Sequence, residues 1–162
     1  MYSRFCARLS KALLGIAALL LVAVILSVQW QVFGRYILND SPTWAESLAL
    51  LLVLYVTAFG AAVGVRDGSH VGFETVAMML PPAGQKVLLV ICHAFVAAFG
   101  GVMAYAGWTW SSAKWGEIKP MLGVPDALDY LPLLVTGVLI LLFSIEHILA
   151  VLQGRKVEPS WN

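Results

Sequence analysis

Charged residues are scarce in this sequence, and long polar stretches are missing. Asp, Glu, Lys and Arg make up 12% of the residues, against about 25% in an ordinary soluble domain. Hydrophobic residues make up 60%, and they are grouped in long runs instead of the short periodic stripes of a water-soluble core. A soluble fold could not bury that much apolar surface. The composition therefore indicates that lipid surrounds most of the chain.

Several chemical signatures are also missing. The net charge of only +1 gives no support to a nucleic-acid-binding surface. The two cysteines, Cys6 and Cys92, stand far apart with no paired-cysteine motif, so neither a disulfide nor a thiolate metal site is expected. The sequence holds no activated-serine elbow, phosphate-binding glycine loop or cluster with metal-ligand spacing. We therefore expect no enzyme activity, no metal and no cofactor.

Four long apolar runs divide the chain. A helix needs about 20 apolar residues to cross ~30 Å of hydrocarbon, and all four runs meet or nearly meet that length. They lack the strict alternation of a barrel strand, so helices are the remaining way to satisfy every backbone group inside lipid. We predict an all-α, four-transmembrane-helix bundle forming one membrane domain, residues 1–162, with spans at about 12–36, 43–65, 85–111 and 128–152.

The first apolar run shares one feature with a secretory signal, because basic residues precede it. Its apolar core is longer than the roughly 7 to 15 residues of a signal, and it runs on to Arg35 and Tyr36 without a small-residue cleavage site. We interpret it as a retained first span.

The distribution of basic residues predicts the orientation. With four spans and the N-terminus inside, the outer segments hold only Arg35, Lys114 and Lys119, and all other Lys and Arg residues fall inside. This asymmetry obeys the positive-inside rule. We expect both termini in the cytoplasm.

A polar turn beginning at Arg66 follows the second span. After His70, the residues Phe73, Val76, Ala77 and Leu80 fall on one helical face. The segment is too short to cross a bilayer, so we predict an amphipathic helix of about residues 70–80 lying in the cytoplasmic interface. A plain structured loop is the alternative.

Two of the polar residues inside the predicted spans, His93 and Glu146, could contact each other. At ~1.5 Å per residue, His93 of the third span and Glu146 of the fourth reach a similar depth. An intramembrane carboxylate is costly unless it is paired. We hypothesise that Glu146 hydrogen-bonds His93 as a polar clamp between helices, with a proton or ion relay as the alternative.

Small residues mark two helix faces that allow close approach of a neighbour. They are Gly60 and Gly64 on the second span, and Gly100 and Gly101 on the third. Contact within the chain and contact with another subunit are both open.

Arg35 and Glu46 flank the first outer turn. Glu46 either completes a capping box with Thr43 or, with Arg35, holds a partner subunit.

Tryptophans cluster before the last span, where Trp108, Trp110 and Trp115 surround Lys114. Tryptophan favours the headgroup level of a bilayer. We therefore place the outer aromatic belt at this point.

Several short motifs occur in a specific order along almost the whole chain. They are Phe33-Gly34-Arg35-Tyr36, Trp44-Ala45-Glu46-Ser47-Leu48, Gly60-Ala61-Ala62 followed by His70-Val71, and Pro120 to Pro125 leading into Tyr130-Leu131-Pro132 and Gly137. In this order the chain resembles the small membrane subunit, the DctQ type, of tripartite ATP-independent periplasmic (TRAP) transporters. It departs from the family at Ser47, where a second acidic residue is frequent.

The resemblance implies a non-catalytic subunit of a secondary, sodium-coupled importer of organic acids. It would brace a large TRAP membrane subunit and help to dock a periplasmic solute-binding protein. The candidate contacts with the large subunit are Arg35, Trp44, Glu46, Gly60, Gly64, Gly100 and Gly101. The candidate docking residues, each of which could instead be merely solvated, are Asp40, Lys114, Glu117, Lys119 and Asp126.

Two other classes of protein stay open at this point. One is a self-contained, proton-coupled four-helix exporter that uses Glu146. The other is a membrane anchor that binds haem or a quinone, although the histidines do not form a clear pair of haem ligands.

Overall fold

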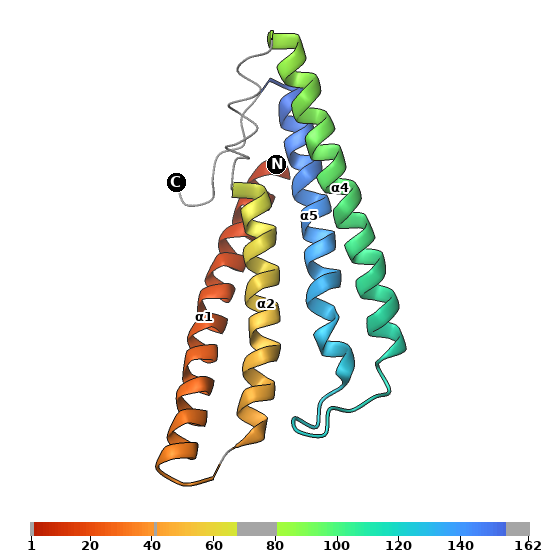
Figure 1. The fold of residues 1–162 in the computed structure, drawn as a ribbon. Coiled ribbons are helices and arrows are strands. Elements are labelled where there is room, and N and C mark those ends of the chain that lie inside the picture. Colours follow the sequence, from red (N-terminus) through yellow and green to blue (C-terminus); the bar gives the residue numbers. More distant parts are fainter. Residues whose placement is uncertain (1, 41, 68–80, 155–162) are drawn as a thin grey trace.

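The computed structural model describes residues 2–40, 42–67 and 81–154, which fold into long helices (Figure 1). The helices are α1 (Tyr2–Tyr36), α2 (Thr43–Asp67), α4 (Pro82–Ala113) and α5 (Leu131–Leu152), with a short 3-10 helix η1 (Asp126–Asp129) before α5. All four long helices are apolar enough to cross a membrane. The prediction of an all-α protein with four membrane-spanning helices is thus confirmed.

Helix α1 starts earlier than the apolar run does. Cys6, Ser10, Leu13 and Ala17 are buried, and their spacing of three and four residues places them on one side of the helix. The basic residues that precede the run lie on the exposed side. Hydropathy alone starts the first span after Lys11, the last basic residue before the apolar run. The prediction therefore missed the amphipathic first part of α1. The predicted interfacial helix, residues 70–80, lies outside the described residues.

The four helices form an open row instead of a closed bundle. Helix α1 packs on α2, α2 on α5, and α5 on α4 (Figure 1). Near its start α1 also reaches α5, where the Tyr2 hydroxyl donates a hydrogen bond to the Leu142 carbonyl oxygen at 2.9 Å. Within the described part of the chain, α4 does not pack against α1 or α2. Two helical hairpins therefore meet along the α2–α5 interface.

Glycines bring α4 and α5 into direct backbone contact. A Cβ atom on Gly107 would overlap the backbone nitrogen of Leu134, and one on Gly137 would overlap that of Ala104. A Cβ on Gly100 would lie 2.9 Å from the Gly137 carbonyl oxygen. Only glycine leaves room for such an approach, which is how helices gain packing energy in lipid.

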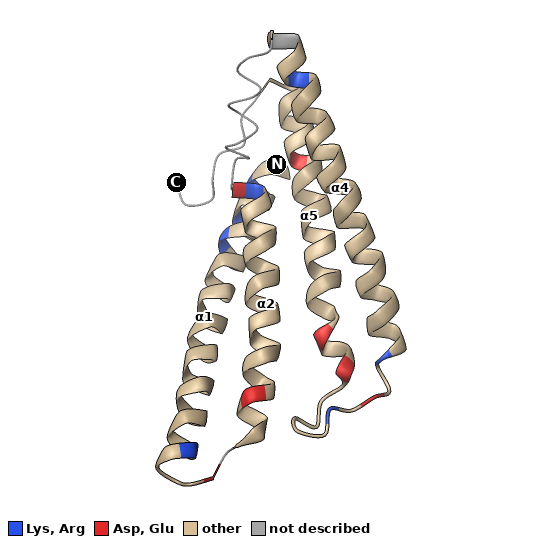
Figure 2. Cartoon of the chain, viewed as in Figure 1, with Lys and Arg blue, Asp and Glu red and all other residues tan. Residues whose placement is uncertain are grey.

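The apolar core lies at the end of the row that holds the N-terminus. It is formed by Cys6, Leu13, Ala62, Val63, Leu139 and Phe143, from α1, α2 and α5. Charged residues gather toward the two ends of the helices and leave the middle stretches free of charge (Figure 2). The core therefore lies beside one of these charged ends, where it borders a group of buried polar side chains.

Candidate functional site

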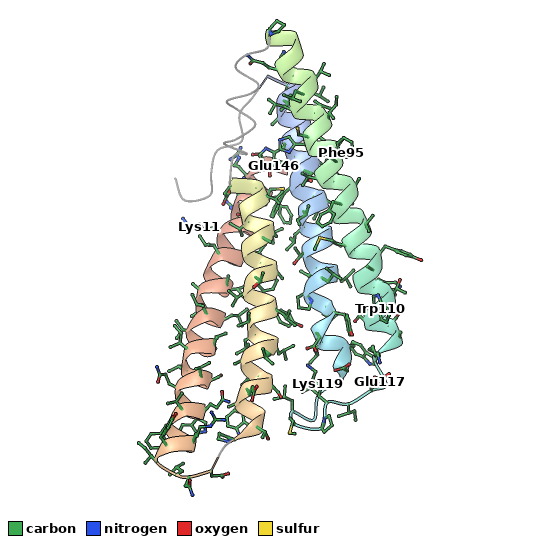
Figure 3. All side chains as sticks on the ribbon, in the orientation of Figure 1. Lys11, Phe95, Trp110, Glu117, Lys119 and Glu146 are labelled. Atoms are coloured by element: carbon green, nitrogen blue, oxygen red, sulfur yellow. The ribbon has the colours of Figure 1, made fainter. Side chains whose placement is uncertain are left out.

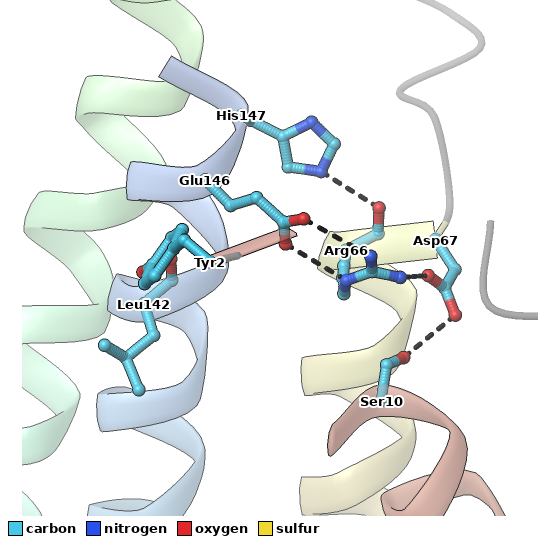
Figure 4. Close-up of polar contacts among 7 residues, drawn as sticks. All are labelled: Tyr2, Ser10, Arg66, Asp67, Leu142, Glu146 and His147. Atoms are coloured by element: carbon cyan, nitrogen blue, oxygen red, sulfur yellow. Dashed lines mark hydrogen bonds and ion pairs between the residues drawn. The ribbon is translucent and has the colours of Figure 1, made fainter. Parts of the chain in front are cut away.

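A buried ion pair joins the end of α2 to α5. The Arg66 side chain reaches Glu146 through two contacts, Nε to Oε2 at 3.1 Å and Nη2 to Oε1 at 3.3 Å (Figure 4). Its Nη1 atom donates to Asp67 Oδ1 at 2.6 Å. All three side chains are almost completely buried. The planar guanidinium suits this arrangement, because its donors can serve two carboxylates at once.

Two further hydrogen bonds extend the group to α1 and back to α5. The Ser10 hydroxyl donates to Asp67 Oδ2 at 2.9 Å. His147 Nε2 lies 2.9 Å from the Arg66 carbonyl oxygen (Figure 4). A carbonyl oxygen only accepts, so this ring nitrogen carries the proton. We call Ser10, Arg66, Asp67, Glu146 and His147 the ionic junction; it ties together three of the four long helices.

Helix α4 joins the same region through a histidine. The His93 ring stacks on the His147 ring, with 4.5 Å between the ring centroids and 8° between the planes. The structure therefore brings His93 close to the residue that follows Glu146, at the similar depth that the sequence predicted. The two hydrogen bonds drawn for Glu146 in Figure 4 go to Arg66, however, and the proposed hydrogen bond between His93 and Glu146 stays a prediction.

The sequence analysis placed Arg66 in a polar turn, and that placement was wrong. Arg66 and Asp67 are the last two residues of α2 and point into the protein. The error has a simple cause: an Arg-Asp pair at the end of an apolar run looks like a solvated helix flank. Glu146 was the available signal, because an intramembrane carboxylate requires a cationic or hydrogen-bonding partner.

The junction has the chemistry of a structural lock. Its charges are paired with one another and closed off from solvent, which is the arrangement that buried charges need.

The two stacked histidine rings are parallel, with 4.5 Å between their centroids. This spacing leaves no room for a haem plane between them. The arrangement gives no support to haem binding by this pair.

The glycines proposed as partner contacts fall into two groups. Gly100 is buried against α5, and a Cβ on Gly101 would lie 3.7 Å from the Leu141 side chain, so both face a helix of the same chain. No atom of the described residues lies within 4 Å of a Cβ placed on Gly60 or Gly64. Of the other candidates, Arg35, Trp44 and Glu46 are exposed. Of the four glycines proposed as partner contacts, Gly60 and Gly64 on α2 are therefore the two that are open to another helix.

The docking candidates lie at the opposite end of the row from the junction. Lys114 pairs with Glu117, with 2.6 Å between Nζ and Oε2, and this hydrogen bond raises the pKa of the Lys114 ammonium. Lys119 pairs with Asp129, with 2.5 Å between Nζ and Oδ2. Asp40 is exposed and Asp126 is half-buried. Asp129 was missed in the sequence, because its role depends on the fold of the loop before α5.

Exposed tryptophans mark this same end. Trp30, Trp44, Trp108, Trp110 and Trp115 all present large exposed surfaces. Figure 3 shows Trp110 near the end that holds Glu117 and Lys119, far from Glu146. The outer aromatic belt near residues 108–115 stays a prediction, for which these exposed rings are available.

Comparison with known families decides the identity of the chain. Residues 24–154 match the DctQ component of the tripartite ATP-independent periplasmic transporters. This chain belongs to the DctQ family. It is a small permease subunit of a TRAP transporter and a multi-pass membrane protein, as the sequence motifs indicated.

Three characterised relatives show how the DctQ family varies. The chain is 29% identical over 89 residues to the sialic acid TRAP transporter small permease protein SiaQ of Vibrio cholerae, covering 55% of this chain and 51% of that protein. It is 33% identical over 64 residues to the C4-dicarboxylate small permease protein of Rhodobacter capsulatus, covering 40% and 28%. It is 24% identical over 123 residues to the ectoine small permease protein TeaB of Halomonas elongata, covering 72% and 64%. The matched part thus spans only about half of the Vibrio protein.

Proposed function

We propose that this DctQ subunit braces the large membrane subunit of a sodium-coupled TRAP transporter that imports an organic acid. The observation that supports a bracing role is that the buried charged groups of its helices are paired with one another. Transporters usually bind solute and ions at broken helices near the middle of the membrane. Here the four long helices are continuous, and the buried charges of the ionic junction are engaged with one another.

The proposed solute class rests on the names of the relatives. Two of them are described as sialic acid and C4-dicarboxylate transporter proteins. Sodium coupling follows from the family resemblance. The ectoine relative shows that the solute differs between family members, so a transport assay with a panel of carboxylates is the direct test.

The free face of α2 is the proposed contact with the large subunit. Gly60 and Gly64 are four residues apart, so they lie on one side of the helix with open space next to them. In lipid, such a face allows a partner helix to approach closely. Arg35, Trp44 and Glu46 extend the proposed contact toward the tryptophan end.

Affinity purification tests the bracing role. A tagged chain in mild detergent should recover a many-span partner. The double variant Gly60→Leu, Gly64→Leu should recover several-fold less, because leucine side chains would hold the partner helix away. Gly15→Leu is the matched control, since Gly15 also has open space around it but lies on α1. Solute uptake by vesicles containing only this chain would contradict the proposal.

The placement in the membrane is also part of the proposal. We propose that the chain lies in a bacterial inner membrane with the junction end toward the cytoplasm. The basic residues Arg4, Arg8 and Lys11 at the start of α1 support this orientation. Topology reporters fused to the two termini should both report a cytoplasmic location, and a periplasmic signal from either would contradict it.

A further inference from the structure

A cleft opens between α2 and the loop that leads into α5. Its volume is ≈ 270 Å³. The residues that shape it are Leu50, Leu51, Leu54, Met121, Lys119 and Asp129. The cleft lies at the tryptophan end and belongs neither to the ionic junction nor to the glycine seam between α4 and α5.

The α2 wall of the cleft consists of Ser47 and three leucines, so it is mostly apolar. Leu50 and Leu54 are one helical turn apart, and both are exposed, Leu50 by 63%. At ~1.5 Å per residue the two positions are separated by about 6 Å along the helix axis. These leucines line a groove in the surface, and an acyl chain lying parallel to α2 would cover them.

The rim of the cleft carries one positive and one negative group. The Lys119 ammonium has three donors, and its contact with Asp129 Oδ2 uses one of them. The Asp129 Oδ1 atom is buried and has no hydrogen-bond partner among the residues that the structure describes. A carboxylate oxygen can accept more than one hydrogen bond, so Oδ2 can accept a further N–H donor beside the Lys119 ammonium. Both side chains are partly exposed, so a ligand can reach them.

The rim also lies at the depth of lipid head groups. The exposed rings of Trp108, Trp110 and Trp115 mark the headgroup level at this end of the protein. Figure 3 shows Lys119 at the same end as Trp110. An apolar groove that ends in a charged pair at this level matches the layout of a phospholipid.

We propose that this cleft binds one phospholipid whose head group contains a primary ammonium. Its acyl chain lies along Leu50 and Leu54, its phosphate contacts the Lys119 ammonium, and its own ammonium donates to Asp129 Oδ2. An anionic glycerol head group would place no cation beside Asp129. A choline head group has a cation but no N–H donor. The pair of rim charges thus selects the ethanolamine type of head group.

Native mass spectrometry of the full chain tests the proposal. The protein is equilibrated in mild detergent with equal amounts of phosphatidylethanolamine, phosphatidylglycerol and phosphatidylcholine that share the same acyl chains. One phosphatidylethanolamine should be retained, with a preference of about tenfold over the other two, the size of one hydrogen bond between charged groups. Asp129→Asn should remove most of that preference while leaving the protein folded.

A second pair of variants tests the groove itself. Leu50→Trp should fill the cleft and abolish lipid retention. Leu26→Trp is the matched control, because Leu26 is 64% exposed and lies on α1, away from the cleft. Equal retention of the three lipids by the unaltered chain would overturn the head-group assignment. Unchanged retention in Leu50→Trp, or a crosslink from Leu50→Cys to the large subunit in place of lipid, would overturn the cleft as a lipid site.

Discussion

At the scale of single residues, Arg66 connects α2 to α5 through both its side chain and its carbonyl oxygen. Its local sequence, an Arg-Asp pair at the end of an apolar run, does not predict these contacts. Its side chain binds Glu146 and Asp67, and its carbonyl oxygen accepts a hydrogen bond from His147. Such a buried cation contributes little net stability when it is paired, but removing it leaves two carboxylates without their counter-charge. The protein therefore depends on Arg66 far more than the net energy of the ion pairs would imply.

We expect Arg66→Ala to lower the free energy of unfolding by about 3–5 kcal/mol, the usual cost of breaking a buried ion pair. Glu146→Gln should also destabilise the protein, because it removes the charge that Arg66 contacts on α5. Thermal unfolding in detergent measures both effects. Arg35→Ala is the control, since Arg35 is exposed and such changes usually stay within about 0.5 kcal/mol. Equal melting temperatures for all three variants and the parent would show that the junction has no structural role.

Glu146 could be predicted from the sequence and Arg66 could not. A carboxylate inside an apolar run needs a partner in the protein, and the sequence offers one inside another predicted span. His93 was the available choice, and it does lie nearby, stacked on His147. Arg66 is 80 residues away from Glu146 along the chain, and its pairing depends on the α2–α5 packing, which has no signature in the sequence.

At the scale of helices, the contact between α4 and α5 is set by glycine. Gly100, Gly107 and Gly137 remove the side chains that would keep the two backbones apart. The sequence predicted the existence of the helices from their length and apolar character. It did not distinguish glycines that face a helix of the same chain from those that face outward, because both kinds occur at similar spacing. That distinction appears only once the order of the helices in the row is known.

Two glycine variants separate these roles. Gly137→Ala should lower the free energy of unfolding by about 1–3 kcal/mol, because the added methyl group overlaps the α4 backbone and the helices must move apart. Gly60→Ala should leave stability unchanged or raise it by up to about 1 kcal/mol, since alanine favours a helix and nothing obstructs it there. Chemical or thermal denaturation in detergent gives both values. Similar effects of the two changes would contradict the packing described for α4 and α5.

At the scale of the whole molecule, the four long helices form a row whose two broad faces no other described helix covers. Apolar side chains such as Leu19, Phe95 and Phe99 are exposed on it. In a membrane, lipid or a partner subunit covers such surfaces. The loops that the structure describes, in contrast, lie at the tryptophan end (Figure 1), and they are the ones proposed to meet the solute-binding protein.

Charge reversal tests that docking role. The double variant Asp40→Lys, Glu117→Lys changes two exposed acidic residues at the tryptophan end. We expect it to reduce solute uptake several-fold at a limiting concentration of the binding protein, because charges at the rim of an interface act mainly on the rate of association. Arg8→Gln, an exposed change at the opposite end, is the control. Normal uptake by the double variant, at equal amounts of subunit in the membrane, would argue against docking at these residues.

The neighbouring positions of Arg66 and Asp67 also bear on how the protein is made. A ribosome completes the α1–α2 hairpin well before it reaches Glu146, and N-terminal parts of a chain begin to fold during synthesis. During that interval Arg66 lacks its partner on α5, but Asp67, which binds it in the folded protein, is the next residue of the same helix. The first hairpin can thus enter the bilayer with its cation neutralised, and it waits in that form until the last helix arrives.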